Sequence, residues 1–235
     1  MKKYIFEIIG VFLALLVLIG DVLYILYGGL WLKGITSALF FLLGIHFLIL
    51  AFLRKKRIHF PVFMVIGLAL TMIADIVLNI HFIAGAILFA LGHIFYAISY
   101  YRLKRWHWLD LVCSCLLAIP AVLWISLAPM FDFGGVLMEI VVVFYAIIIS
   151  FMVGKAISNF ISNILKHQDY RVALIILIGS ILFFFSDCML LLNKFGAFSK
   201  DIREILTILC LGTYYPAQIL LATSIRIYVQ LDYLV

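Results

Sequence analysis

Apolar residues along this chain fall into eight long runs, separated by short polar segments. Each run has the roughly 20 residues that a helix needs to cross the hydrocarbon core of a membrane. We therefore expect an all-α, polytopic membrane protein, a bundle of eight transmembrane helices in which residues 1–235 form a single transmembrane domain. The expected spans are 4–27, 31–53, 60–79, 82–101, 108–127, 135–157, 171–192 and 204–228.

Composition leads to the same fold class. Hydrophobic residues make up 68% of the chain and charged residues 12%, whereas ordinary globular domains have about 45–50% and about 25%. Eight spans would use on the order of 160–170 residues, which leaves no room for a soluble domain. The first 20 residues resemble a signal peptide, but their apolar run contains Glu7 and continues through Asp21 to about Tyr27. We interpret this segment as a first span that is retained.

Positive charges are distributed unequally between the two sets of connections. With the N-terminus inside, the outer side receives four of the 17 Lys and Arg residues, and the inner side receives all the others. This asymmetry follows the positive-inside rule, so both termini are expected in the cytoplasm. The basic balance is then a topology signal, and no nucleic-acid partner is expected. The four outer residues are Lys33, Lys194, Lys200 and Arg203.

Four of the acidic residues in the expected spans stand out as candidates: Asp21, Asp75, Glu139 and Asp187. A charged group in hydrocarbon costs at least about 2.5–3.5 kcal/mol on insertion scales, so such residues are functional candidates. The alternating direction of the spans puts all four at the outer level of the bilayer, where Lys33 also begins the second span. A structural alternative stays open for Asp75 and Asp187, since each could merely cap a helix or pair with a lysine.

Further polar residues share helix faces within the same region. Spacings of three or four residues bring side chains to one side of a helix. We therefore expect a polar pocket in the outer half of the membrane, where one carboxyl group acts as an acid and another as a base. The shared faces are Thr71, Asp75 and Asn79 in the third span, His93 and Tyr96 in the fourth, and Tyr214 and Gln218 in the eighth.

A metal site is not expected. The histidines at or near membrane depth are His46, His81 and His93, and no two of them share a face at four-residue spacing. A zinc site would need the second and fourth spans to bring their histidines together. For His46, which has no polar neighbour at helical spacing, a purely structural role is expected.

Three segments resemble the YhhN family, whose eukaryotic members are lysoplasmalogenases. The stretch ADIVLNIHFIAGAILFALGHIFYAISYY (74–101) is similar to the family's signature. The stretch GSILFFFSDCMLLLNKF (179–195) is similar to its Ser-Asp helix with a trailing Asn-Lys/Arg-Phe, and TYYPAQILLA (213–222) to its Tyr-Tyr-x-x-Gln helix. Ala74 and Gly34 depart from the family pattern, which has a glycine and a proline at these positions.

The resemblance implies hydrolysis of the vinyl-ether bond of a lysoplasmalogen, without a cofactor and with Asp75 and Asp187 as the catalytic pair. Such a reaction needs a general acid and a base that activates water. The implied partner is a membrane lipid, a lysoplasmalogen or a related single-chain ether lipid, and the implied location is a multi-pass position in the membrane, the cell membrane if the source is prokaryotic. The expected pocket residues are Lys33, Asn79, His93, Tyr96, Tyr145, Ser186, Asn193, Tyr214 and Gln218.

Two other functions are compatible with intramembrane acids. A small transporter could relay protons or bind a cation through them. Against this, the acids cluster at one level and form no path, and only the eighth span has an internal proline, Pro216, beside polar groups. A lipid-binding scaffold without catalysis would tolerate the loss of both Asp75 and Asp187.

Overall fold

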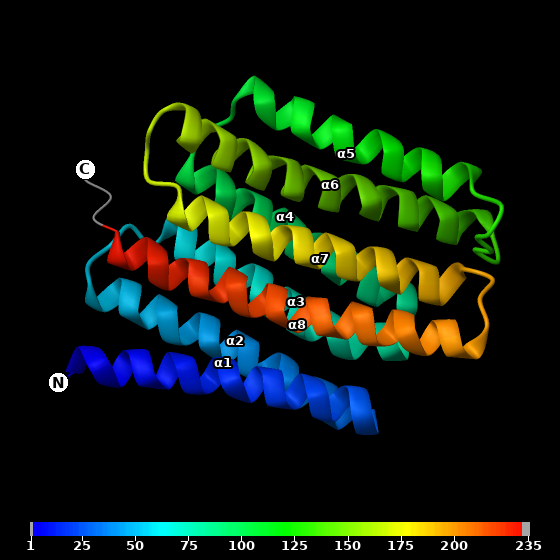
Figure 1. Ribbon diagram of the computed structural model, residues 1–235, viewed down its shortest axis with the longest axis horizontal. Coiled ribbons are helices and arrows are strands. Elements are labelled where there is room, and N and C mark those ends of the chain that lie inside the picture. The colour runs from blue at the N-terminus through cyan, green and yellow to red at the C-terminus, as the bar shows by residue number, and fades with distance from the viewer. Residues whose placement is uncertain (1, 232–235) are drawn as a thin grey trace.

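The computed structural model describes residues 2–231, and these form eight helices, each long and apolar enough to cross a membrane (Figure 1). The all-α, eight-span prediction and the multi-pass membrane location are thereby confirmed. The helices are α1 (Lys2–Tyr27), α2 (Leu30–Leu53), α3 (His59–Ile80), α4 (Phe82–Leu103), α5 (Trp108–Leu127), α6 (Val136–Leu165), α7 (Arg171–Phe195) and α8 (Lys200–Gln230).

The largest difference from the expected spans is at the end of α6, which continues beyond residue 157 to Leu165. Polar side chains in this extension are buried against neighbouring helices and do not face solvent. Asn159, which is 3% exposed, donates its amide to the carbonyl of Tyr100 at 3.1 Å. Ser158 and Ser162 are buried as well. Because these residues pack between helices, α6 continues past the expected end of the span.

Connections between consecutive helices are short, and local chemistry explains the tightest of them. Gly28 and Gly29 join α1 to α2 with φ of 66° and 96°, a region in which residues with a Cβ are strained. His81 alone joins α3 to α4, and its ring accepts the N–H of Ala84 at 3.2 Å, which caps the start of α4. At the start of α5, His107 and Asp110 form a reciprocal capping box.

The helices lie side by side in an elongated bundle, with α1 and α5 at its two edges (Figure 1). The beginning of α1 and the end of α8 lie at the same end, which we call the proximal end. The opposite, distal end carries the connections at 28–29, 81, 128–135 and 196–199. Cytoplasmic orientation of the proximal end stays a prediction from the positive charges.

Small residues allow close helix contacts. A Cβ at Gly67 of α3 would lie 2.5 Å from the ring of Tyr96 on α4, and one at Gly154 of α6 would lie 2.5 Å from the backbone nitrogen of Ser114 on α5. Membrane helices lack a strong hydrophobic drive to associate, so close packing of this kind contributes much of their stability. The outward surface is apolar, as lipid contact requires.

Two connections are fastened together at the distal end. The 128–135 connection pairs with the end of α7 through an isolated bridge between Phe131 and Gly196. Arg203 on α8 donates its guanidinium to the carbonyls of Asn193 at 2.6 Å and Gly196 at 2.9 Å. Sequence analysis treated Arg203 only as a topology charge, whereas here it holds the α7–α8 connection in place beside the site described next.

Candidate functional site

A cavity of about 340 Å³ lies toward the distal end, with walls from α1, α2, α3, α4, α7 and α8. Its volume is in the range of small-molecule sites. Both candidate catalytic acids line it, one from α3 and one from α7. Its polar lining residues are Tyr24, Lys33, Asp75, Asn79, Ser186, Asp187, Asn193, Lys194, Thr207, Cys210 and Tyr214.

Asp75 is surrounded by donors from two other helices. Its Oδ2 accepts the hydroxyl of Ser37 on α2 at 2.6 Å and that of Tyr214 on α8 at 2.8 Å. The ammonium of Lys33, also on α2, lies 3.6 Å from Oδ1. With 2% of its surface exposed, Asp75 is nearly enclosed. Three donors around one carboxylate satisfy its oxygens in a place where water is scarce.

Asp187 has different partners. The phenol of Tyr145 on α6 donates to its Oδ2 at 2.5 Å, and Nε2 of His93 on α4 lies 3.4 Å from the same oxygen. His93 Nε2 is also 2.8 Å from the Tyr145 oxygen. Because Tyr145 has one proton and gives it to Asp187, Nε2 of His93 must carry the proton of the second bond. The result is a chain of donors, His93 to Tyr145 to Asp187.

The sequence-predicted residues divide into three groups. Those that line the cavity are Lys33, Asp75, Asn79, Ser186, Asp187, Asn193 and Tyr214. His93 and Tyr145 do not line the cavity, but both contact Asp187, which does. Tyr96 and Gln218 do not line this cavity: they are fully buried and bond to each other, phenol to amide oxygen, at 2.8 Å.

The remaining intramembrane acids and His46 lie elsewhere. Asp21 on α1 is 4% exposed and is not part of the cavity wall, and neither is Glu139 in the first turn of α6. His46 packs its ring against Phe6 and bonds to that residue's carbonyl at 2.9 Å, the structural role expected for it. In residues 2–231, no three His, Cys, Asp or Glu side chains come together in a way that could hold a metal ion.

Five polar contributors to the site were not among the predicted site residues: Ser37, which bonds to Asp75, and Tyr24, Lys194, Thr207 and Cys210, which line the cavity. Ser37 is four residues after Lys33, so a search along the face of the second span that carries Lys33 would have found it. Cys210 lies inside an apolar run of the eighth span, and its sulfur is 3.4 Å from the hydroxyl of Ser186. A serine inside an apolar run carries little signal, because its hydroxyl can always bond to its own helix.

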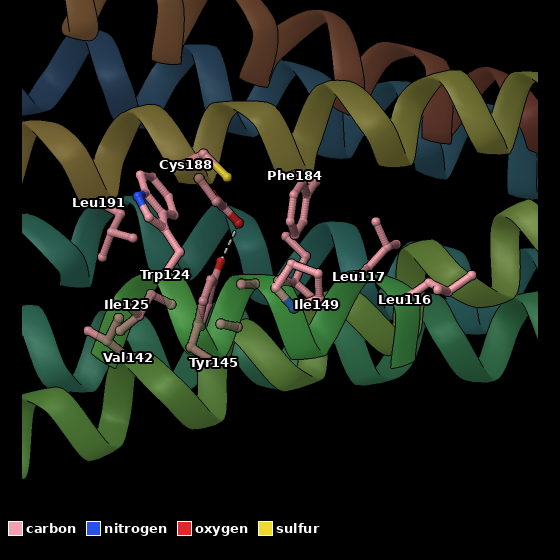
Figure 2. A pocket seen from close by; sticks show the side chains of 14 residues that line it. Leu116, Leu117, Trp124, Ile125, Val142, Tyr145, Ile149, Phe184, Cys188 and Leu191 are labelled. Atoms are coloured by element: carbon pink, nitrogen blue, oxygen red, sulfur yellow. Dashed lines mark hydrogen bonds between the residues drawn. The ribbon is translucent and has the colours of Figure 1, made fainter. Parts of the chain in front are cut away.

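An apolar groove of about 360 Å³ reaches Asp187 from the other side of α7. Figure 2 shows its wall, with Leu191 and Ile125 toward one end, Leu116 and Leu117 toward the other, and Tyr145 between them. The dashed line in Figure 2 marks the bond from Tyr145 to Asp187. Asp187 therefore borders both spaces, the polar cavity and the apolar groove. A smaller space of about 50 Å³ also borders Asp187 and Tyr145, and it lies against Phe82 and Phe89.

Comparison with known proteins agrees with the resemblance in sequence. The sequence model of the YhhN family matches residues 36–225, which include every predicted site residue except Lys33. No curated protein and no solved structure matches the chain. Since the match covers most of the chain, including both acids of the cavity, the protein belongs to the YhhN family.

Proposed function

We propose that this protein is a membrane-embedded hydrolase that cleaves the vinyl-ether bond of a lysoplasmalogen or a related single-chain ether lipid. The observation that carries the proposal is the pair of carboxyl groups, Asp75 and Asp187, which line one cavity and have contrasting hydrogen-bond partners. Membership of a family whose eukaryotic members are lysoplasmalogenases supports it.

The chemistry needs two groups of this kind. A proton is added to the β-carbon of the vinyl ether, and the π electrons of the double bond form the new C–H bond. The α-carbon and the ether oxygen then share the positive charge as an oxocarbenium ion. Water attacks the α-carbon and loses one proton to a base. The resulting hemiacetal breaks its bond to the glycerol oxygen, and transfer of its hydroxyl proton to that oxygen gives a fatty aldehyde and a free glycerol hydroxyl. Glycosidases handle a similar cation with two carboxyl groups.

We propose separate roles for the two acids from their partners. Asp75 faces Ser37, Tyr214 and the ammonium of Lys33, and we propose it as the base that takes the proton from water. Asp187, whose Oδ2 accepts the hydroxyl of Tyr145, is then the group that we propose donates the proton to the β-carbon. After one turnover Asp75 holds the proton that Asp187 has lost. Water in the shared cavity can return it, because both side chains line the same space.

Cations at the rim of the cavity suit a phospholipid headgroup. Lys194 lies at the end of α7, exposed, with its ammonium 5.3 Å from the centre of the Phe82 ring. Asn193 and Thr207 line the cavity beside it. A phosphate at this level would meet one cation and neutral donors without entering the apolar part of the bundle.

A transporter is not favoured by this arrangement. Asp75 and Asp187 share one cavity near one end of the bundle, whereas a proton or cation path would require polar groups that continue to the other end.

Release of fatty aldehyde tests the proposal. Purified protein in detergent, with a chelator present, is given lysoplasmenylethanolamine or the matched lipid in which the vinyl ether is a saturated alkyl ether. The saturated lipid has no double bond to protonate, so aldehyde is expected from the vinyl ether alone. Absence of aldehyde in both reactions, from protein shown to be folded, would overturn the proposed activity.

A further inference from the structure

Three helices, α5, α6 and α7, form the apolar groove, and a gap between α5 and α7 leaves it open. α5 packs on α6 and α6 packs on α7, but within residues 2–231 α5 and α7 do not contact each other. Side chains of both nevertheless line the groove, with Ala146 and Ile149 of α6 between them. The groove is therefore a furrow with α6 at its base, and the gap between α5 and α7 opens it toward the lipid around the protein.

The groove has a definite length and direction. On α5 it extends from Leu116 to Ile125, which at 1.5 Å per residue is about 14 Å along the helix. This is about half of the 30 Å hydrocarbon core. Its deep end, at Leu117 and Ile149, points toward the proximal half of the bundle, away from the polar cavity.

The chemistry of its wall changes at one point. Most lining residues are aliphatic or aromatic, and the acidic one among them is Asp187, held by Tyr145. A molecule that enters from the polar cavity passes Asp187 and then meets only hydrocarbon and the thiol of Cys188 on its way to Leu117. A single-chain ether lipid has its parts in the same order: a polar headgroup, then the reacting bond, then a long hydrocarbon chain.

We infer that the groove between α5, α6 and α7 binds the hydrocarbon chain of the lipid substrate, an inference that rests on the proposed function. The chain runs from Asp187 to Leu117 in the same direction as the chains of the neighbouring leaflet, so the substrate slides in through the α5–α7 gap without turning over. Its first carbons lie beside Asp187, where the proton must be delivered. One furrow takes one chain, which explains selection of a lyso lipid over a two-chain lipid.

Photolabelling tests occupancy independently of turnover. The probe is a lysophosphatidylcholine analogue with a saturated ether-linked chain that carries a diazirine at its end, and labelled residues are identified by mass spectrometry. Labelling is expected at Leu117 or Ile149, and an excess of unlabelled single-chain lipid should reduce it. Labelling at Leu123, which is 52% exposed on the outer face of α5, reports ordinary lipid contact and should not be reduced. Groove labelling that resists competition would overturn the inference.

Chain-length preference gives a second readout. Leu117→Trp fills the deep end of the groove, so turnover of an 18-carbon substrate should fall about tenfold or more relative to a 10-carbon one, in line with the effect of steric mismatch in apolar pockets. Leu123→Trp adds the same side chain to the lipid-facing side of the same helix and should leave the preference unchanged. Equal preference in wild type and Leu117→Trp would contradict the inference.

The two proposals can fail separately. If unlabelled lipid reduces labelling of the groove but no aldehyde is released from a vinyl ether, the proposed reaction is wrong and the groove is still a site for a single-chain lipid. Aldehyde release without competed labelling, and with no change of chain preference in Leu117→Trp, would leave the reaction and remove the groove as its chain site.

Discussion

Two lysine–aspartate pairs inside the bundle have the same chemistry and opposite surroundings. Lys33 and Asp75 join α2 to α3 near the distal end, with 3.6 Å between Nζ and the nearest carboxylate oxygen. Lys155 and Asp110 join α6 to α5 nearer the proximal end at 2.8 Å. The ammonium of Lys155 also donates to the Arg105 carbonyl at 3.1 Å. The first pair lines a cavity, whereas the side chains of the second are 1% and 2% exposed and belong to none of the cavities described above.

The difference shows what makes a buried charge a functional group. Oδ2 of Asp110 accepts the backbone N–H of His107 at the start of α5 and the ammonium of Lys155 on α6. These bonds hold α5 and α6 together. Asp75 has comparable donors but faces space that a substrate and water can enter. An intramembrane ion pair by itself therefore identifies no active site. Our proposal rests on the open volume beside Asp75 and on the second carboxyl group that lines the same cavity.

The largest expected effect is on catalysis, from Asp75→Asn. The amide keeps an oxygen that can accept from Ser37 and Tyr214 but cannot take a proton from water, so aldehyde release should fall by about 10²–10⁴-fold. The melting temperature should fall, because the buried ammonium of Lys33 loses its carboxylate, so turnover is expressed per folded molecule. If turnover is retained, Asp75 is not the base, and the two lysine–aspartate pairs do not differ in their role in catalysis.

Lys155→Met should have the next largest effect, and on stability. It leaves the Asp110 carboxylate buried without its cation, which typically costs about 3–5 kcal/mol of unfolding free energy. Turnover per folded molecule should not change, because Lys155 lies outside the cavity. Denaturation in detergent and aldehyde release from the folded fraction check the two halves. Loss of turnover in fully folded protein would show that the proximal pair takes part in the reaction.

A smaller effect is expected from Lys33→Met. Removal of one ammonium beside Asp75 should lower turnover about tenfold, equivalent to about 1.4 kcal/mol in the barrier. Stability should change less than in Lys155→Met, since Ser37 and Tyr214 still donate to Asp75. A titration of turnover against lipid concentration separates a role in substrate affinity from one in the chemical step. A loss of stability equal to that of Lys155→Met would make Lys33–Asp75 a second structural clamp.

The smallest effect on activity is expected from Tyr96→Phe. Tyr96 donates to Gln218 away from the cavity, so turnover should stay within about twofold while unfolding free energy falls by about 1–3 kcal/mol because a buried acceptor loses its donor. Aldehyde release and thermal unfolding on the same preparation measure both. A large loss of turnover at unchanged stability would restore Tyr96 to the site.

Much of the fold could be predicted, because span length and the distribution of positive charge follow directly from the physics of the bilayer. The acids of the cavity were also predictable, since a carboxyl group in hydrocarbon is costly wherever it occurs. Lys155 was different. Its proximity to the expected end of a span made it look like a loop charge, and its partner Asp110 lies on another helix. Which polar faces meet depends on helix rotation, and this is why Tyr96 and Gln218 were expected in the pocket and pack outside it.

One matched pair of substitutions tests the central claim most directly. Asp187→Asn and Asp110→Asn make the same change of carboxylate to amide, one in the cavity and one in the proximal pair. Aldehyde released from lysoplasmenylethanolamine per folded molecule should fall by about 10²–10⁴-fold in Asp187→Asn and stay within about twofold of the wild type in Asp110→Asn. Wild-type turnover in Asp187→Asn, or an equal loss in both variants, would contradict the assignment of catalysis to the distal cavity.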